Sequence, residues 1–196
     1  MSDPTPGPLP EQRPYGPSAL YTPANLVTIA RLLVSPVLFG MIADDTATWT
    51  AFSLWMVLAL SDGVDGYLAR RHGTTRSGAF LDPLADKVLV LGALFVLVGV
   101  GRFWWLPVAL IAFREVGISL FRSYYGRLGL AIPATKGAKV KTVVQAFAVG
   151  FALCPATDQV EWLADVSLWA AVVLTLVTGA QYVIAGRRST TTSGER

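Results

Sequence analysis

Cysteine and histidine are almost absent from this chain of 196 residues, which contains one of each, Cys154 and His72. A single cysteine excludes an intrachain disulfide, and Cys154 is expected to be a small packing residue in an apolar segment. His72 follows Arg71 in a polar segment and is predicted to be a loop residue rather than a catalytic one. The chemistry of the chain is therefore expected to depend on carboxylates and basic side chains.

Charged residues are also scarce, which argues against an ordinary soluble domain. They make up 15% of the chain, against 53% for hydrophobic residues, and the mean hydropathy is +0.52. Six apolar segments each have roughly the 17 to 25 residues that a helix needs to cross a bilayer. These segments cover approximately residues 26–43, 49–69, 79–100, 104–125, 139–155 and 165–185. The sequence therefore predicts an all-α, polytopic membrane protein with six transmembrane helices.

The two ends of the chain differ in composition from this apolar region. Six of the twelve prolines lie in the first 20 residues, so residues 1–21 are predicted to form a flexible, Pro-rich cytoplasmic arm. No basic start followed by an apolar core and a cleavage site is found, so no signal peptide is expected. Residues 22–186 are predicted to form one six-helix domain, and residues 187–196 a disordered cytoplasmic tail.

The distribution of Lys and Arg predicts an orientation, because basic residues in short loops stay on the cytoplasmic side. They gather in two predicted loops and the tail: Arg70, Arg71, Arg76, Arg127, Lys136, Arg187, Arg188 and Arg196. The intervening loops carry four acidic residues, Asp44, Asp45, Asp158 and Glu161, and one basic residue, Arg102. Both termini are thus expected in the cytoplasm, with the chain in the inner (plasma) membrane.

Four aspartates stand at the ends of two apolar segments: Asp62, Asp65, Asp82 and Asp86. A carboxylate at membrane depth costs a few kcal/mol or more unless it is neutralised or hydrated, so it indicates a functional site. The spacings of three and four residues place each pair on one helix face. All-oxygen ligation suits a hard cation, so Mg²⁺ or Mn²⁺ is the expected cofactor. The alternative is that these aspartates are solvated caps at helix ends.

The pattern D-x2-D-G-x2-A-R, followed by G-x3-D-x3-D, resembles the signature of the CDP-alcohol phosphotransferases, integral membrane enzymes that make phospholipid headgroups. Every fixed position is filled: Asp62, Asp65, Gly66, Ala69, Arg70, Gly78, Asp82 and Asp86. The gap between Arg70 and Gly78 is one residue shorter than is common in the family. The resemblance implies a metal-dependent homodimer in which an acceptor alcohol displaces CMP from a CDP-linked lipid.

The resemblance also implies residue roles. Asp62, Asp65, Asp82 and Asp86 would be the metal ligands, and Asp86 would also take the proton of the acceptor hydroxyl as general base. The CDP-linked lipid would be bound by Asn25, Thr28, Gly66, Ala69, Arg70 and Thr75. Asn25 could instead be a helix cap, and Gly66 and Ala69 could serve helix packing alone. Pro83 predicts a kink or a helix start beside Asp82.

Four further segments look like the bacterial phosphatidylglycerophosphate synthases, a branch of this family: residues 25–31, 81–88, 114–115 and 137–142. This branch implies CDP-diacylglycerol and glycerol 3-phosphate as substrates. The acceptor phosphate is predicted to be bound by basic residues inside the spans: Arg114, Arg122, Lys139 and Lys141. Lys139 and Lys141 are about 200° apart on a helix, so both are not expected to contact the same group. Glu115 could instead pair with Arg114.

Other functions are weighed on the same residues. A cardiolipin synthase of this family would use phosphatidylglycerol, or another acceptor, in place of glycerol 3-phosphate. A cation transporter would need polar groups across the whole bilayer, whereas the outer halves of the predicted spans are almost wholly apolar. An inactive scaffold is disfavoured by the complete acidic set, and no nucleic-acid partner is expected.

Overall fold

The computed structural model describes the backbone of residues 23–72, 78–127 and 137–193, and the side chains of residues 25–61, 84–121 and 140–180. Over these ranges the chain is helical and has no strand, as the sequence predicts. The elements are α1 (Pro23–Asp44), α2 (Trp49–His72), α3 (Gly78–Gly99), α4 (Trp105–Arg127), α5 (Gly137–Leu153), the 3-10 helix η1 (Pro155–Val160) and α6 (Trp162–Ser193).

The α-helices coincide in position with the six apolar segments. Two of them, over Asn25–Asp44 and Trp162–Ala180, are long and apolar enough by themselves to cross a membrane. The described parts Trp49–Ser61 and Val140–Leu153 are apolar but shorter. The all-helical fold is therefore confirmed for the described residues, while the number of spans and their orientation stay predictions.

Three helix ends differ from the predictions. The α6 helix continues to Ser193, so most of the segment predicted to be a disordered tail is helical. No proline interrupts it, and Ser and Thr lower helix propensity by only tenths of a kcal/mol per residue, about 0.7 at most. The α2 helix includes His72, which was predicted to lie in a loop. The α3 helix already begins at Gly78, so the predicted helix start at Pro83 is wrong; near a helix end proline removes only one backbone hydrogen bond.

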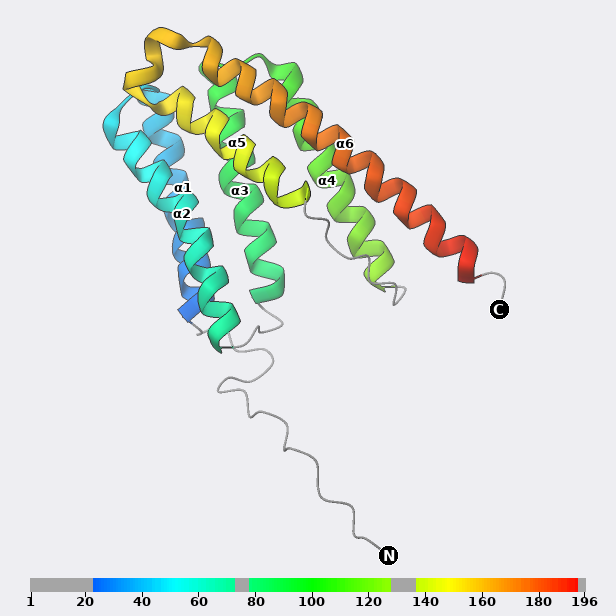
Figure 1. The fold of residues 1–196 in the computed structure, drawn as a ribbon. Coiled ribbons are helices and arrows are strands. Elements are labelled where there is room, and N and C mark those ends of the chain that lie inside the picture. The colour runs from blue at the N-terminus through cyan, green and yellow to red at the C-terminus, as the bar shows by residue number, and fades with distance from the viewer. Residues whose placement is uncertain (1–22, 73–77, 128–136, 194–196) are drawn as a thin grey trace, which may run out of the picture.

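The packing order brings the motif-bearing helices to one end of the bundle. The α1 helix packs against both α2 and α3, α5 packs against α6 and also contacts α2 and α3, and α4 packs against α6 and α3. Figure 1 shows the first turn of α1, the last turn of α2 and the first turn of α3 together at the lower end. Helix η1 and the connection between α1 and α2 lie at the opposite end.

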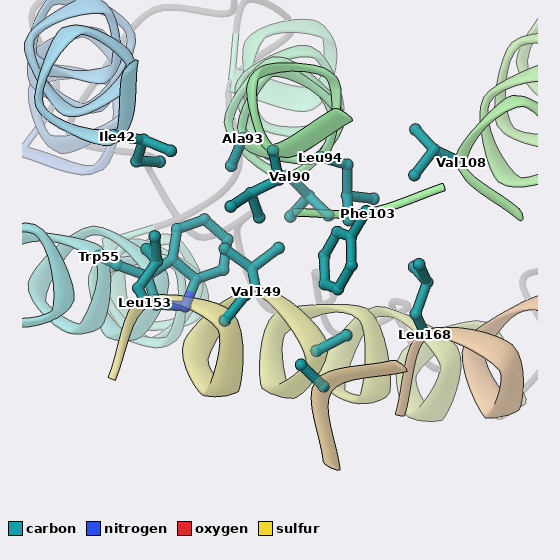
Figure 2. Packing of buried hydrophobic residues seen from close by; sticks show 14 of the residues in the cluster. Ile42, Trp55, Val90, Ala93, Leu94, Phe103, Val108, Val149, Leu153 and Leu168 are labelled. Atoms are coloured by element: carbon teal, nitrogen blue, oxygen red, sulfur yellow. The ribbon is translucent and has the colours of Figure 1, made fainter. Parts of the chain in front are cut away.

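A cluster of buried apolar side chains joins the helices of the bundle (Figure 2). The Trp55 indole of α2 is buried, and its Nε1 donates a hydrogen bond of 3.3 Å to the Ala146 carbonyl of α5. Helices α1 and α3 approach closely at Gly92, where a Cβ atom would lie 2.3 Å from the Phe39 ring. The described members of this core are apolar.

Exposed tryptophans surround the end of the bundle where α2, α4 and α6 begin. They are Trp49, Trp104, Trp105, Trp162 and Trp169. The Trp104 ring lies 6.4 Å from that of Trp105 and 6.3 Å from that of Trp169. At the same end, Arg102 links the connection between α3 and α4 to the start of α6. It forms an ion pair with Asp165 at 3.4 Å and donates a hydrogen bond of 3.1 Å to the Glu161 carbonyl. Tryptophan is enriched where a membrane protein meets the headgroup layer.

Candidate active site

The four motif carboxylates lie on two helices. Asp62 and Asp65 are in the last turns of α2, and Asp82 and Asp86 are in the first turns of α3. The Asp86 side chain is half-buried, and it is the one member of the four whose side chain is described. The described side chains contain no group of three His, Cys, Asp or Glu residues that could hold a metal ion. Three of the four predicted ligands lie outside that search.

A buried polar stripe runs along α1 from the same end of the bundle. Its members, spaced three or four residues apart, are Asn25, Thr28, Arg31 and Ser35. This spacing places them on one helix face, and α1 buries that face against α2 and α3. Asn25 and Thr28 are the predicted nucleotide-binding residues of this helix. Because α1 begins at Pro23, Asn25 lies inside the first turn, and its predicted alternative as a helix cap is wrong.

Arg31 ties this stripe to the motif. The residue is 1% exposed, and its Nε donates a hydrogen bond of 3.2 Å to Oγ of Ser61 on α2. Ser61 in turn donates to the Leu58 carbonyl at 2.7 Å, and Ser35 donates to the Arg31 carbonyl at 2.7 Å. Since Asp62 follows Ser61 directly, the polar face of α1 lies beside the start of the motif.

A second buried polar cluster joins α4, α5 and α6. Glu115 Oε1 accepts a hydrogen bond from Arg114 Nη1 at 3.0 Å and another from Lys141 Nζ. The Nη2 atom of Arg114 donates to Oγ1 of Thr178 at 2.9 Å. The charged side chains are 6% to 10% exposed, so each needs a partner of opposite charge. The predicted pairing of Glu115 with Arg114 is present, and Lys141 shares the same carboxylate.

The second polar cluster, called the cation cluster from here on (Arg114, Glu115 and Lys141), interacts with the motif. The Lys141 ammonium interacts electrostatically with Asp86 and Lys87 of α3 as well as with Arg114. The structure therefore brings the predicted general base and two of the predicted phosphate-binding residues into one electrostatic neighbourhood. An anion bound by Lys141 would therefore also act electrostatically on Asp86.

Several predicted site residues have side chains that the structure does not describe: Asp62, Asp65, Gly66, Ala69, Arg70, Thr75, Asp82, Arg122 and Lys139. Thr75 lies between the described ranges, and the others are on helices α2 to α5. Their roles stay predictions.

Sequence reasoning missed the polar partners of the site. Besides Ser61 and Thr178 they include Gln145, whose Nε2 donates to Oγ1 of Thr175 at 3.2 Å. A spacing signal was present, since Gln145 follows Lys141 by four residues and Thr178 follows Thr175 by three. Each spacing indicates one helix face, and together they form a polar seam between α5 and α6.

An apolar groove of about 320 Å³ lies between α4 and α6, next to the cation cluster, and Arg114 is one of its lining residues. Its lining residues are Phe113, Arg114, Gly117, Ile118, Phe121, Leu176, Gly179 and Ala180. Gly179 leaves room for the arginine, because a Cβ atom there would lie 3.2 Å from Arg114 Nε and 3.3 Å from its Cγ. The absence of a side chain at Gly179 therefore allows Arg114 to take this position.

Comparisons with known proteins agree with the motif. The model of the CDP-alcohol phosphatidyltransferase family matches residues 21–177, which include every described residue of both polar clusters except Thr178. A Mycobacterium tuberculosis protein named probable phosphatidylglycerophosphate synthase is 37% identical over 171 residues, covering 84% of this chain and 81% of its own. Proteins of Escherichia coli and Shigella flexneri, both named CDP-diacylglycerol–glycerol-3-phosphate 3-phosphatidyltransferase, are 36% identical over 171 residues, covering 83% of this chain and 93% of theirs.

Substitution of Gly179 by Ala is expected to lower the thermal midpoint of the purified protein in detergent. The new methyl group would press on an arginine that Glu115 and Thr178 hold, and such overpacking costs about 1 to 3 kcal/mol. Gly117→Ala is the matched control, because a Cβ atom there meets nothing within 4 Å. Equal thermal midpoints for the two variants would contradict this account of Arg114.

Proposed function

Because the chain belongs to the CDP-alcohol phosphatidyltransferase family, we propose that it transfers the phosphatidyl group of CDP-diacylglycerol to sn-glycerol 3-phosphate. The products are phosphatidylglycerophosphate and CMP, and the reaction is a step of phospholipid biosynthesis. The names of the relatives support this choice of substrates. The observation that carries it is the buried cluster of Arg114, Lys141 and Glu115 beside Asp86, which suits an acceptor that bears a phosphate.

The reaction breaks the phosphoanhydride bond of CDP-diacylglycerol and forms a phosphodiester. An oxygen of the acceptor hydroxyl forms a bond to the phosphorus next to the diacylglycerol, and the bond from that phosphorus to the CMP oxygen breaks. The hydroxyl proton passes to a base, which must lie within hydrogen-bond reach. Asp86 is proposed as that base, and its half-buried position near Lys141 supports the assignment. Lys141 and Arg114 would hold the acceptor phosphate and so orient the hydroxyl.

The four carboxylates fit a divalent metal by their chemistry. Two helices bring them to one end of the bundle, and an all-oxygen donor set suits Mg²⁺ or Mn²⁺. Asp62, Asp65, Asp82 and Asp86 would be the ligands, and a bound metal would neutralise the pyrophosphate charge. Arg70, Thr75 and the small residues Gly66 and Ala69 would complete the nucleotide site with Asn25 and Thr28. The burial of these last two beside α2 supports their part in it.

The membrane arrangement is proposed on the same grounds. The family and the apolar helices support membrane association. We propose six spans in the inner membrane, both termini in the cytoplasm and the active site on the cytoplasmic side, where a water-soluble acceptor can enter. The exposed tryptophans at the opposite end suit an outer headgroup layer. A homodimer is proposed from the resemblance to the family.

The choice of acceptor is tested with purified protein in detergent, CDP-diacylglycerol and Mg²⁺. Glycerol 3-phosphate is expected to release CMP and to give phosphatidylglycerophosphate, whereas phosphatidylglycerol is expected to give neither CMP nor cardiolipin. Both CMP and the lipid product are measured with each acceptor in parallel. Consumption of phosphatidylglycerol alone would make the chain a cardiolipin synthase and would overturn the proposed substrate, but not the reaction type.

The roles of the carboxylates are separated by two substitutions. Asp82→Asn is expected to abolish turnover and Mg²⁺-dependent thermal stabilisation, since an amide oxygen binds a hard cation less well. Asp86→Asn is expected to lower kcat by on the order of 10² to 10⁴ with a smaller effect on CDP-diacylglycerol binding. Asp45→Asn, at the opposite end of the bundle, is the control. Equal losses of affinity and rate at position 86 would make Asp86 a ligand only.

The orientation is tested with single cysteines in a Cys154→Ser background. Cysteines at positions 75 and 134 are expected to react with a membrane-impermeant thiol reagent only when the cytoplasmic side is exposed. Those at positions 45 and 158 should react from the outside, because acidic loops face away from the cytoplasm. Labelling at position 75 in intact cells would reverse the proposed orientation and the route of the nucleotide.

A further inference from the structure

Glu115 holds two cations from two helices on one oxygen atom. Its Oε1 accepts from Arg114 Nη1 at 3.0 Å and from Lys141 Nζ, and its side chain is 10% exposed. A carboxylate that only neutralised Arg114 would have no need of a lysine from another helix. The shared oxygen brings a guanidinium and an ammonium side by side, which two like charges do not do unaided.

The second terminal nitrogen of Arg114 also has a fixed partner. Arg114 Nη2 donates to Oγ1 of Thr178 at 2.9 Å, and that hydroxyl donates to the Leu174 carbonyl at 2.7 Å. Gly179 of α6 packs on the aliphatic part of the same side chain. Lys141 has a different character, because its ammonium carries three donors on a flexible stem. It can remain on Glu115 with one donor and offer another to an incoming anion.

Arg114 and Lys141 share one carboxylate, so the negative charge of Glu115 is divided between two cations. Among the described residues, the groups of α3 that also act on Lys141 are Lys87 and Asp86, whose charges oppose each other. The paired cations therefore attract a further anion such as a phosphate.

From this geometry we propose that Glu115 is a positioning residue for the acceptor phosphate, holding Arg114 and Lys141 together as a two-point anion receptor. The inference rests on the proposed function, because it names glycerol 3-phosphate as the anion. Glu115 does not touch the phosphate, since carboxylate and phosphate repel. It fixes the distance between the two cations before the acceptor arrives, so that little ordering is needed on binding.

The test is the KM for each substrate in Glu115→Gln, which keeps the size of the side chain and removes its charge. The KM for glycerol 3-phosphate is expected to rise about ten- to hundredfold, the usual effect of losing a charge-assisted contact. The KM for CDP-diacylglycerol should change less than about twofold. Glu115→Asp, which keeps the charge, should recover part of the affinity. The double variant Glu115→Gln/Lys141→Gln should resemble Lys141→Gln alone, because the two residues act as a unit.

Asp165→Asn is the control, because it breaks the Arg102 ion pair at the other end of the bundle and should leave both KM values unchanged. A purely structural Glu115 would give a different result: a lower thermal midpoint and a smaller active fraction, with the KM for glycerol 3-phosphate unchanged in the active fraction. That result would overturn the inference.

A second readout separates this inference from the proposed function. Inorganic phosphate should raise the thermal midpoint of the wild-type protein by binding the folded state, and should do so much less in Glu115→Gln. If the wild-type protein made no product from glycerol 3-phosphate, the proposed function would fail while this difference would still support the anion receptor. Equal phosphate stabilisation in both proteins, or none in the wild-type protein, would overturn the receptor.

Discussion

Charge buried in an apolar helix bundle must be matched within the bundle, and this constraint organises the described structure. Breaking a buried ion pair by removing one partner costs about 3 to 5 kcal/mol, so buried ionic side chains occur in groups. Arg31 is accommodated by the polar face of α1 and by Ser61, and Arg114 by Glu115 and Thr178. Each group joins helices that are distant in sequence. The polar contacts therefore align the helices as well as serving the site.

The two polar clusters divide the helices between them. The stripe on α1 lies against α2 and α3, which carry the carboxylates, whereas the cation cluster is built by α4, α5 and α6. Lys141 is the link, because it acts on Asp86 from the second cluster. A transferase that joins a lipid nucleotide to a phosphorylated alcohol needs two such anion sites side by side. Apart from these two polar clusters, the described helices pack through an apolar core (Figure 2).

The sequence was sufficient to predict the helices and the motif, because both depend on residues that are close together in the chain. Apolar runs of membrane-spanning length gave six helix positions, and a fixed spacing of carboxylates gave the family. The length of α6 was missed, because Gly186 directly after Ala185 and the basic pair Arg187 and Arg188 are typical of a helix end, whereas the helix continues through them to Ser193. The partners Ser61, Gln145 and Thr178 were missed for another reason. Their importance depends on which helix faces which, and spacing along one helix does not give that.

The contact between Gly92 and Phe39 has a consequence for how the two positions can change over time. The ring of one helix occupies the space that any side chain at the other position would need. A larger residue at position 92 is therefore compatible with this packing only after, or together with, a smaller residue at position 39. The two sites therefore form an ordered pair of substitutions across the α1–α3 interface: a larger residue at position 92 cannot come first, whereas a smaller residue at position 39 can.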